Sequence, residues 1–362
     1  MLVYHFFSDP RKGGPHVFVN SIKMYHNSNI TTKIVTCGKS SESDLNLFNF
    51  RYIWRPLYVI EVFLNVILII FNHFKAKPSE RPDIYHVHSM LNIAPIIASR
   101  FTGIRTVWHI HECLKNYFFF LQVGMFISKK CKIISVSETA IKQFCLSGIE
   151  LIPAAIDTSF WESRFYINDN INVEYNNDEK EYTLLAVGNL NPLKGFDILL
   201  ESLETIKLPI KLQIIGEELT THKAFSEKLK QTTKKIISEN SNLKVEFLGR
   251  KNSFDVRKLL FECDCFVLSS RSEACPIALL EAVSMGVPCI VADVGDTRSI
   301  LSIHPNAKIF SAGSVQELTR AINLMSINKT NETCRKSFLE SKFSARNVAS
   351  QLEKIYVKLN ID

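Results

Sequence analysis

The sequence lacks internal repeats, stretches that indicate disorder, and any cysteine framework. Its 9 cysteines are scattered over 362 residues, and several lie in apolar segments typical of buried strands or helices. Cys263 and Cys265 form a C-x-C pair, but no second pair follows at zinc-binding spacing. We therefore expect reduced core cysteines in a cytosolic protein, with neither disulfides nor a zinc site.

Charge of one sign is also scarce. The 43 lysine and arginine residues exceed the 36 acidic residues by only seven, and they form no basic block and no basic stripe interleaved with aromatic residues. Nucleic acid is therefore not an expected partner. The mild excess fits a weak attraction to an anionic membrane surface or an ordinary solvated surface.

A signal peptide and a full membrane span are not expected either. Residues 1–7 continue directly into a strand pattern without a basic leader region. Residues 57–71 are apolar, but they are too few for a full span and include Glu61 and Asn65, which favours a buried or partly exposed helix. The aromatic-rich run 115–127 is either a core helix or a surface that faces an acceptor or a membrane.

What is present is an alternation of short apolar strands and helical segments. With 46% hydrophobic residues over this length, the chain suits two α/β domains. We expect an N-terminal domain over 1–166, a polar linker rich in Asn and Asp over 167–181, and a C-terminal domain over 182–344.

The most informative stretch is 266–295. It predicts a buried strand at 266–268, a polar loop at 269–275, a buried helix at 277–285 and a second strand at 287–292. Pro276 suits the first helical position, and Gly286 suits the C-cap.

Two carboxylates interrupt this apolar unit. Glu281 lies on a helix that is apolar nearly all round, so it pairs with an arginine of a neighbouring element or faces a ligand. Cys275 is a poor N-cap, which leaves the first helical amides available to an anion. Phosphate at the helix start, with Glu273 and Glu281 accepting hydrogen bonds from hydroxyls, is the chemistry of a nucleotide-sugar site.

This stretch resembles the E-x7-E signature of the family-4 retaining glycosyltransferases. The family motif S-x-x-E-x-x-P-x-x-x-x-E-A-x-x-x-G-x-P, followed by a strand that ends at glycine, is matched by Ser270, Glu273, Pro276, Glu281, Ala282, Gly286, Pro288 and Gly295. The resemblance implies an α/β protein of the GT-B fold, in which two Rossmann-like domains face each other across a cleft. It also implies that the last helix, within 345–362, returns to the N-terminal domain.

Further motifs of the family recur along the chain. Gly13 and Gly14 follow the first strand, where the family places a Gly-Gly pair that faces the donor phosphates. The segment 188–195 (GNLNPLKG) resembles a V-G-R-L-x-x-x-K-G loop, which implies that Lys194 binds the diphosphate. The frequent arginine of that loop is Asn189 here, so one cation is missing. Arg250 is either its replacement or a surface charge.

Histidines end two strands of the N-terminal half. His88 closes the run 84–88, and the run 106–111 contains His109 and His111. Polar groups at the carboxyl ends of parallel strands are candidates for ligand contact. The family's His-Asp-like strand end corresponds to His111 and Glu112, which implies that His111 lies near the transferred sugar. His109 remains an alternative.

The resemblance implies transfer of a sugar from a nucleotide diphosphate sugar, expected to be a UDP-sugar, to an acceptor hydroxyl with retained anomeric configuration. Glu273, His111 and Lys194 are the expected catalytic residues. The expected donor-binding residues are Gly13, Gly14, Asn189, Arg250, Cys275, Pro276, Ile277, Ala278 and Glu281. No D-x-D motif lies near them, so neither a metal nor a cofactor is expected.

The expected acceptor is a saccharide or lipid-linked saccharide, in bacterial surface polysaccharide assembly. We expect a cytoplasmic protein with peripheral contact to the inner face of the membrane. Two alternatives remain open. One is a sugar-nucleotide 2-epimerase of GT-B fold, and the other is a non-catalytic partner subunit.

Overall fold

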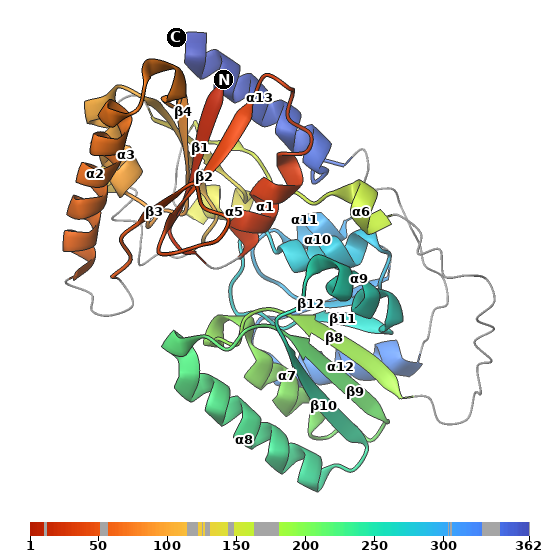
Figure 1. Cartoon of the computed structure of the whole chain (residues 1–362). Coiled ribbons are helices and arrows are strands. Elements are labelled where there is room, and N and C mark those ends of the chain that lie inside the picture. Colours follow the sequence, from red (N-terminus) through yellow and green to blue (C-terminus); the bar gives the residue numbers. More distant parts are fainter. Residues whose placement is uncertain are drawn as a thin grey trace. The chain divides into compact units, whose positions relative to one another are not determined.

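The computed structural model describes residues 1–10, 13–50, 57–113, 122–124, 126, 131–143, 148–162, 181–302, 304, 306–327 and 341–361. The chain divides into two compact units (Figure 1), one of Met1–Asp157 with Glu340–Asp362 and one of Thr158–Leu339. The second unit begins ahead of the expected boundary at 166. The expected linker 167–181 lies outside the described residues, except for residue 181.

A seven-stranded parallel sheet forms the centre of the first unit. Its strand order is β3-β2-β1-β4-β5-β6-β7. The strands are β1 (Leu2–Phe7), β2 (Thr31–Cys37), β3 (Leu45–Leu47), β4 (Ile84–His88), β5 (Arg105–Ile110), β6 (Cys131–Ser135) and β7 (Glu150–Leu151).

Helices cover both faces of this sheet. The helices are α1 (Gly14–Ile22), α2 (Leu57–Lys75), α3 (Ala94–Thr102), α5 (Glu138–Gln143) and α13 (Ala345–Ile361). Helices α1 and α13 pack together on one face, whereas α2 and α3 pack together on the other (Figure 1). Because side chains alternate along a strand, His86 of β4 points towards α13, and Tyr85 belongs to the core on the α2 side.

The second unit has a six-stranded parallel sheet with the order β10-β9-β8-β11-β12-β13. Its strands are β8 (Tyr182–Val187), β9 (Ile210–Ile215), β10 (Leu243–Gly249), β11 (Cys265–Leu268), β12 (Cys289–Ala292) and β13 (Ala307–Phe310). All residues of β11 and β12 are buried. Strands covered on both faces are apolar without alternation, which explains their sequences CFVL and CIVA.

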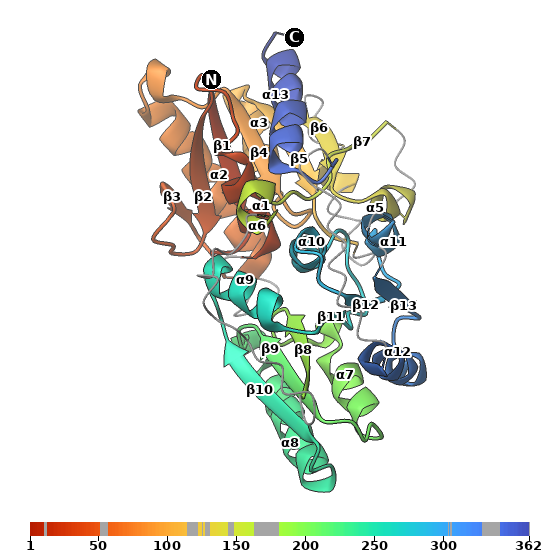
Figure 2. The same ribbon diagram turned by 90° about the vertical axis from the view of Figure 1, so that its right-hand side faces the viewer.

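Seven helices are described in the second unit. They are α6 (Thr158–Glu162), α7 (Phe196–Leu203), α8 (Lys223–Glu239), α9 (Ser253–Glu262), α10 (Ile277–Ser284), α11 (Thr297–Leu301) and α12 (Val315–Ile327). Helices α7, α8 and α12 share the main core of the sheet, and α9, α10 and α11 lie on its opposite face (Figures 1 and 2).

A few expected elements differ from the observed ones. The edge strand β3 at Leu45–Leu47 was not expected from the sequence. Helix α2 extends to Lys75, beyond the apolar run, because helical periodicity continues through Phe74. The aromatic-rich run 115–127 lies outside the described part, apart from 122–124 and 126.

Candidate active site

The loops after β8 and β11 meet at the carboxyl edge of the second sheet. The two strands are hydrogen-bonded neighbours, and the order of strands along the chain reverses between them. Ligands of open parallel sheets bind at such a switch point. Loops 188–195 and 269–276 therefore form the candidate site of this unit.

An ion pair connects these two loops. Nζ of Lys194 lies 2.6 Å from Oε1 of Glu273, and the hydroxyl of Ser270 donates to the same oxygen at 2.7 Å. The side chains of Lys194 and Glu273 are 27% and 13% exposed, so each remains accessible to a ligand. Both were expected as site residues, and the structure brings them together.

Two glycines allow the backbones of the site to approach closely. Gly195 has a φ of +63°, and a Cβ atom there would lie 2.1 Å from the carbonyl oxygen of Ser269. Gly295 has a φ of +54°, and its Cβ would lie 2.4 Å from the carbonyl oxygens of Glu273 and Ala274. A side chain at either position would push the loops apart.

Helix α10 begins next to this ion pair without a side-chain cap. The N-cap is Pro276, with φ −72° and ψ 112°, so Pro276 is not the first helical residue as expected, and Cys275 is not the cap. Proline has no side-chain acceptor, and among the described residues the amides of Ile277 and Ala278 donate to no protein group. These amides and the positive end of the helix dipole form an anion site.

Glu281 lies in the second turn of α10 and is 8% exposed. Burial raises the pKa of its carboxyl from 4.5 to about 8, and within the described part of the chain no hydrogen bond or ion pair opposes that rise. The arginine partner that was one of its two expected environments is thus not found there. A buried carboxyl without a partner is costly unless a ligand satisfies it.

Asn189 and Arg250 occupy neighbouring turns. The side-chain oxygen of Asn189 accepts a hydrogen bond from the backbone N–H of Glu217 at 3.2 Å, so it braces the turns after β8 and β9. Arg250 follows β10, and its guanidinium lies 3.9 Å from the carboxylate of Glu217 with both side chains exposed. Arg250 is therefore free to move towards an anion at low cost.

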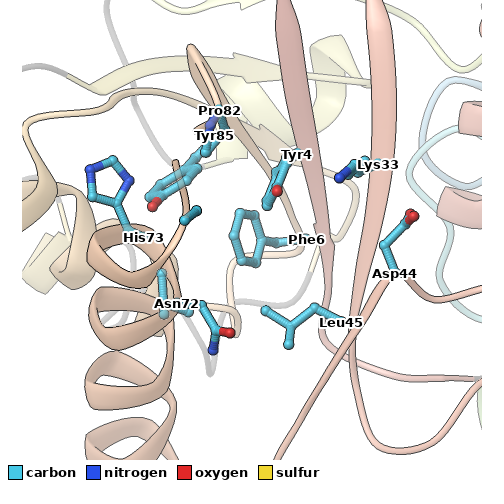
Figure 3. A pocket seen from close by; sticks show the side chains of 11 residues that line it. Tyr4, Phe6, Lys33, Asp44, Leu45, Asn72, His73, Pro82 and Tyr85 are labelled. Atoms are coloured by element: carbon cyan, nitrogen blue, oxygen red, sulfur yellow. The ribbon is translucent and has the colours of Figure 1, made fainter. Parts of the chain in front are cut away.

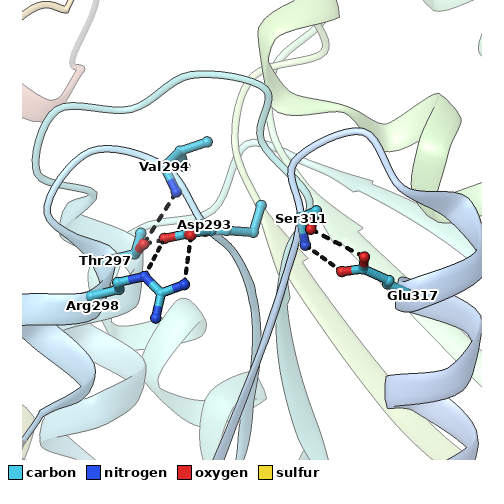
Figure 4. A network of polar contacts seen from close by, with 7 residues as sticks. Asp293, Val294, Thr297, Arg298, Ser311 and Glu317 are labelled. Atoms are coloured by element: carbon cyan, nitrogen blue, oxygen red, sulfur yellow. Dashed lines mark hydrogen bonds and ion pairs between the residues drawn. The ribbon is translucent and has the colours of Figure 1, made fainter.

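The turns after β12 and β13 are held by side chains (Figure 4). Arg298 forms two hydrogen bonds with the carboxylate of Asp293, at 2.8 and 2.7 Å. The hydroxyl of Thr297 accepts from the N–H of Val294 at 3.3 Å, which fixes the turn that contains Gly295. In the next turn, the Glu317 carboxylate accepts from Ser311.

In the first unit, Gly13 and Gly14 lie at the start of α1, after β1. Gly13 is the N-cap, with no side-chain cap, and Gly14 is the first helical residue. The carbonyl of Gly13 accepts from the amides of His16 and Val17. This is a second helix start with amides directed beyond the carboxyl edge of a sheet.

Five histidines line one face of the first sheet, four of them on β1, β4 and β5, with His111 directly after β5. The nitrogen contacts are His5 to His88 at 3.0 Å, His88 to His111 at 2.9 Å and His86 to His109 at 3.3 Å. His109 is fully buried and bonded to the carbonyl of Ile152. His111 is half-buried, so it is the more accessible of the two candidates.

The backbone after His88 is strained. Ser89 has a φ of +77° and is the only described residue other than glycine with a positive φ. The indole of Trp108 donates to its carbonyl at 2.9 Å. The half-buried carboxylate of Glu112 accepts from the amides of Met90 and His111. Such strain is retained where neighbouring groups fix it, often at ligand sites.

The first unit also contains a cavity of about 170 Å³ (Figure 3). It lies between α2 and the edge of the sheet and is lined by Tyr4, Phe6, Lys33, Leu45, Asn72 and Tyr85. Those that belong to strands lie on the sheet face opposite the histidines, and Asn72 belongs to α2. The cavity is smaller than the roughly 300–1,000 Å³ of typical ligand pockets, so we assign it to imperfect packing of α2.

Comparison with known proteins agrees with the chemistry of this site. Residues 168–337 match the sequence profile of the family Glycosyl transferases group 1. The matched segment lies within the second unit and spans just under half of the chain. The match covers loops 188–195 and 269–276 and helix α10, and therefore the Lys194–Glu273 pair and Glu281.

Proteins that are similar to longer parts of the chain are glycosyltransferases. An uncharacterized glycosyltransferase of Methanocaldococcus jannaschii is 27% identical over 226 residues, 60% of either chain. The Escherichia coli UDP-Gal:alpha-D-GlcNAc-diphosphoundecaprenol alpha-1,3-galactosyltransferase is 23% identical over 326 residues. This chain spans 60% of the length of the first relative and 82% of the second.

The fold is also that of known glycosyltransferases. Anabaena HepE, whose structure contains UDP, superposes with a TM-score of 0.75 and 16% identity, covering 99% of this chain and 100% of HepE. Two Rossmann-like domains with parallel sheets are the GT-B architecture expected from the sequence, and that expectation is confirmed.

Sequence reasoning missed several residues that support the site. Arg271 forms two hydrogen bonds with Asp197, at 2.8 and 2.7 Å, and ties loop 269–276 to α7. His5 and Tyr356 complete the histidine network from opposite ends of the chain. A lone histidine in an apolar strand gives no signal of this kind, because the partners come from distant segments.

Proposed function

We propose that this protein transfers a sugar from a nucleotide diphosphate sugar to an acceptor hydroxyl, with retention of anomeric configuration. The observation that carries the proposal is Glu281, a buried carboxyl without a described protein partner. It lies in the helix whose uncapped start is suited to phosphate. Ribose hydroxyls are the donors that would satisfy it.

The Lys194–Glu273 pair supplies the groups for the reacting end of the donor. An ammonium group has three donors, so Lys194 can hold Glu273 and still bind a phosphate oxygen. It would stabilise the departing diphosphate, and Glu273 would accept hydrogen bonds from the donor sugar. Retention rests on the family resemblance, in which a donor phosphate oxygen takes the proton of the acceptor hydroxyl.

We assign the remaining donor contacts from the places of the residues in the loops and at the helix starts. The amides of Cys275, Ile277 and Ala278 would surround the phosphates, and the Gly13–Gly14 turn would also bind them, as the Gly-Gly pair of the resembled family does. The amides around Asn189 and Arg250 would border the nucleotide base. The UDP-dependent relative and the UDP complex of HepE favour UDP as the nucleotide, with a hexose as the transferred sugar.

We further propose an acceptor at a membrane, a saccharide or lipid-linked saccharide of bacterial surface polysaccharide assembly. Helix α2 is long and apolar enough to cross a membrane by length and composition. Only 28% of that apolar segment is buried in the protein, so most of it is exposed. Its inward residues are Glu61, Asn65, Ile69 and His73. The carboxylate of Glu61 accepts from the amide of Phe50, and Asn65 bonds to the backbone of Phe48.

The outward face of α2 is the apolar one, formed by Val59, Ile60, Phe63, Ile67, Phe71 and Phe74, which are 49–71% exposed. Lys75 and Arg81 lie over the rings of Phe71 and Phe74. An apolar stripe flanked by cations suits the headgroup region of an anionic bilayer. The proposed location is the cytoplasm, at the inner face of the membrane.

The test is donor turnover. Purified protein is incubated with UDP-, GDP- and dTDP-sugars, with and without a bacterial lipid extract, and nucleotide release is measured. Lipid-dependent release from one donor, lost in Glu281→Gln, supports a transferase and names its donor. Epimerised donor without acceptor would favour the epimerase, and no turnover or donor-induced thermal shift would favour the partner subunit.

The same assay tests the role of metal ions. We propose that the reaction needs none, since Lys194 and helix α10 supply the positive charge that a metal gives to other transferases. Full activity after dialysis against EDTA is the expected result. Loss of activity that Mg²⁺ or Mn²⁺ restores would overturn this part of the proposal.

A further inference from the structure

The histidines of the first unit form two separate hydrogen-bonded rows. In the outer row, the hydroxyl of Tyr356 lies 2.5 Å from Nδ1 of His86, Nε2 of His86 lies 3.3 Å from Nδ1 of His109, and Nε2 of His109 lies 3.1 Å from the carbonyl of Ile152. In the inner row, His88 contacts His5 through Nε2 and His111 through Nδ1.

The outer row has one consistent arrangement of protons. A carbonyl only accepts, so His109 carries its proton on Nε2 and accepts at Nδ1 from His86. The Tyr356 hydroxyl then donates to Nδ1 of His86. All four ring nitrogens are engaged, and burial lowers the pKa of both histidines, which keeps the rings neutral.

The inner row has two arrangements, because neither end is fixed by a carbonyl. The three protons all lie on Nδ1 or all lie on Nε2. Nε2 of His5 is buried and has no hydrogen-bond partner among the described residues, so the second arrangement would leave an N–H group orphaned in the core. Orphaned buried N–H groups are especially rare, and the first arrangement is therefore favoured.

In the favoured arrangement, His111 accepts from His88 at Nε2 and carries its own proton on Nδ1. That nitrogen makes no hydrogen bond with any described residue. Burial lowers the pKa of His111 well below its usual value, and the nearby His109 lowers it further. At neutral pH His111 is thus an uncharged hydrogen-bond donor rather than a general acid.

We propose that His88, supported by His5, is a positioning residue that fixes His111 as an Nδ1–H donor to a substrate oxygen. This inference rests on the proposed function, because substrate contact at His111 is part of that function. The aromatic packing supports it, since Phe7 stacks on His88 at 4.7 Å and 6° and Phe18 packs edge-on against His111. The rings of the row are held in one orientation.

A metal site is the competing interpretation of these residues. Ligand atoms of His88, His109 and His111 lie within 4.8 Å of one another. However, both nitrogens of His109 are already engaged in the outer row, and those of His88 bridge its two neighbours. A metal would have to break at least two hydrogen bonds, so two hydrogen-bonded rows are the better account of these residues.

The test is nitrogen NMR of protein with labelled histidine, near neutral pH. The expected spectrum shows His111, assigned with the His111→Ala variant, protonated on Nδ1 and unprotonated on Nε2. In His88→Leu we expect a mixture of tautomers and a loss in kcat/KM of roughly three- to tenfold. His88→Asn places an amide donor where Nδ1 was and should restore both the tautomer and the rate.

Three results would overturn the proposal that His88 positions His111. They are a wild-type His111 protonated on Nε2, an unchanged tautomer in a folded His88→Leu protein, and stoichiometric Co²⁺ binding with a tetrahedral visible spectrum. The wild-type spectrum decides even if His88→Leu fails to fold. That spectrum also decides the role of His88 in the absence of measurable sugar transfer. Failure of the positioning role and failure of the proposed function are therefore distinguishable.

Discussion

Nζ of Lys194 and Oε1 of Glu273 lie 2.6 Å apart, although 79 residues separate them in the chain. The contact exists because β8 and β11 are neighbours in the sheet, which places their following loops side by side. Sequence motifs gave the two residues different roles, in phosphate binding and in sugar binding. Their pairing indicates that the two roles are coupled.

The first prediction concerns this coupling. Lys194→Ala and Glu273→Gln should each lower kcat/KM by roughly ten- to hundredfold, since a hydrogen bond to a charged group is worth about 1.5–3 kcal/mol. The free-energy loss in kcat/KM of the double variant should be smaller than the sum of the two single losses, because each single change already breaks the Lys194–Glu273 pair. Steady-state kinetics of the four proteins gives the coupling energy.

Lys258→Ala is the matched control. Lys258 pairs with Glu262 at 3.8 Å on α9, and both side chains are exposed, so its loss should change neither rate nor stability. Strictly additive losses at Lys194 and Glu273, or an equal loss at Lys258, would show that the pair does not act as a unit.

The second prediction concerns the pH dependence of stability. The folded pKa of Glu281 is raised from 4.5 to about 8, so the folded protein binds a proton that the unfolded chain has released between these values. Its contribution to the free energy of unfolding therefore falls as pH rises through this window, by up to about 1.4 kcal/mol per pH unit. Glu281→Gln should abolish that contribution.

Denaturant unfolding at several pH values measures this difference. The variant should gain stability relative to the natural protein as pH increases from 5 to 8, in total by a few kcal/mol. Glu262→Gln, at an exposed position of α9, serves as the control. Parallel pH profiles for all three proteins would mean that Glu281 is ionised in the fold.

Much of the fold was predictable, because its central strands β4, β11 and β12 are buried on both faces and appear as largely apolar runs. Helix α10 spans Ile277–Ser284, within one residue of the predicted range 277–285. The inner row of histidines and the Lys194–Glu273 contact were not predictable, since both depend on which strands are neighbours. Helix α2 was recognised as apolar, but sequence alone did not show that Glu61 and Asn65 face inwards.

The third prediction concerns Gly295. An alanine there meets two costs, a positive φ and a Cβ 2.4 Å from the carbonyl oxygens of Glu273 and Ala274. Gly295→Ala should therefore destabilise the protein and weaken UDP binding, because the loop that carries Glu273 must shift. Gly313→Ala is the control, with a φ of +88° and, within the described part of the chain, no neighbouring atom within 4 Å of its Cβ.

Thermal unfolding and calorimetric titration with UDP separate the two costs. The control should lose about 1–2 kcal/mol of stability from backbone conformation alone, with unchanged affinity for UDP. The excess loss in Gly295→Ala then reports the steric contact. Equal losses in both variants, with UDP binding intact, would show that the loop tolerates the side chain.

The last prediction concerns the outward face of α2. The exposed rings of Phe63 and Phe71 lie on the same helix face as Ile67, and Lys75 adds positive charge at its end. The protein should therefore sediment with phosphatidylglycerol vesicles more than with phosphatidylcholine vesicles, and added salt should weaken the excess by screening the charge. Phe63→Ser with Phe71→Ser should lower binding at least tenfold, since apolar burial contributes about 25 cal/mol per Å².

Phe254→Ser on α9 removes a ring that is equally exposed, 58% like Phe71, and should leave binding unchanged. Vesicle binding that survives the α2 changes, or is lost equally in Phe254→Ser, would exclude α2 as the membrane-facing surface.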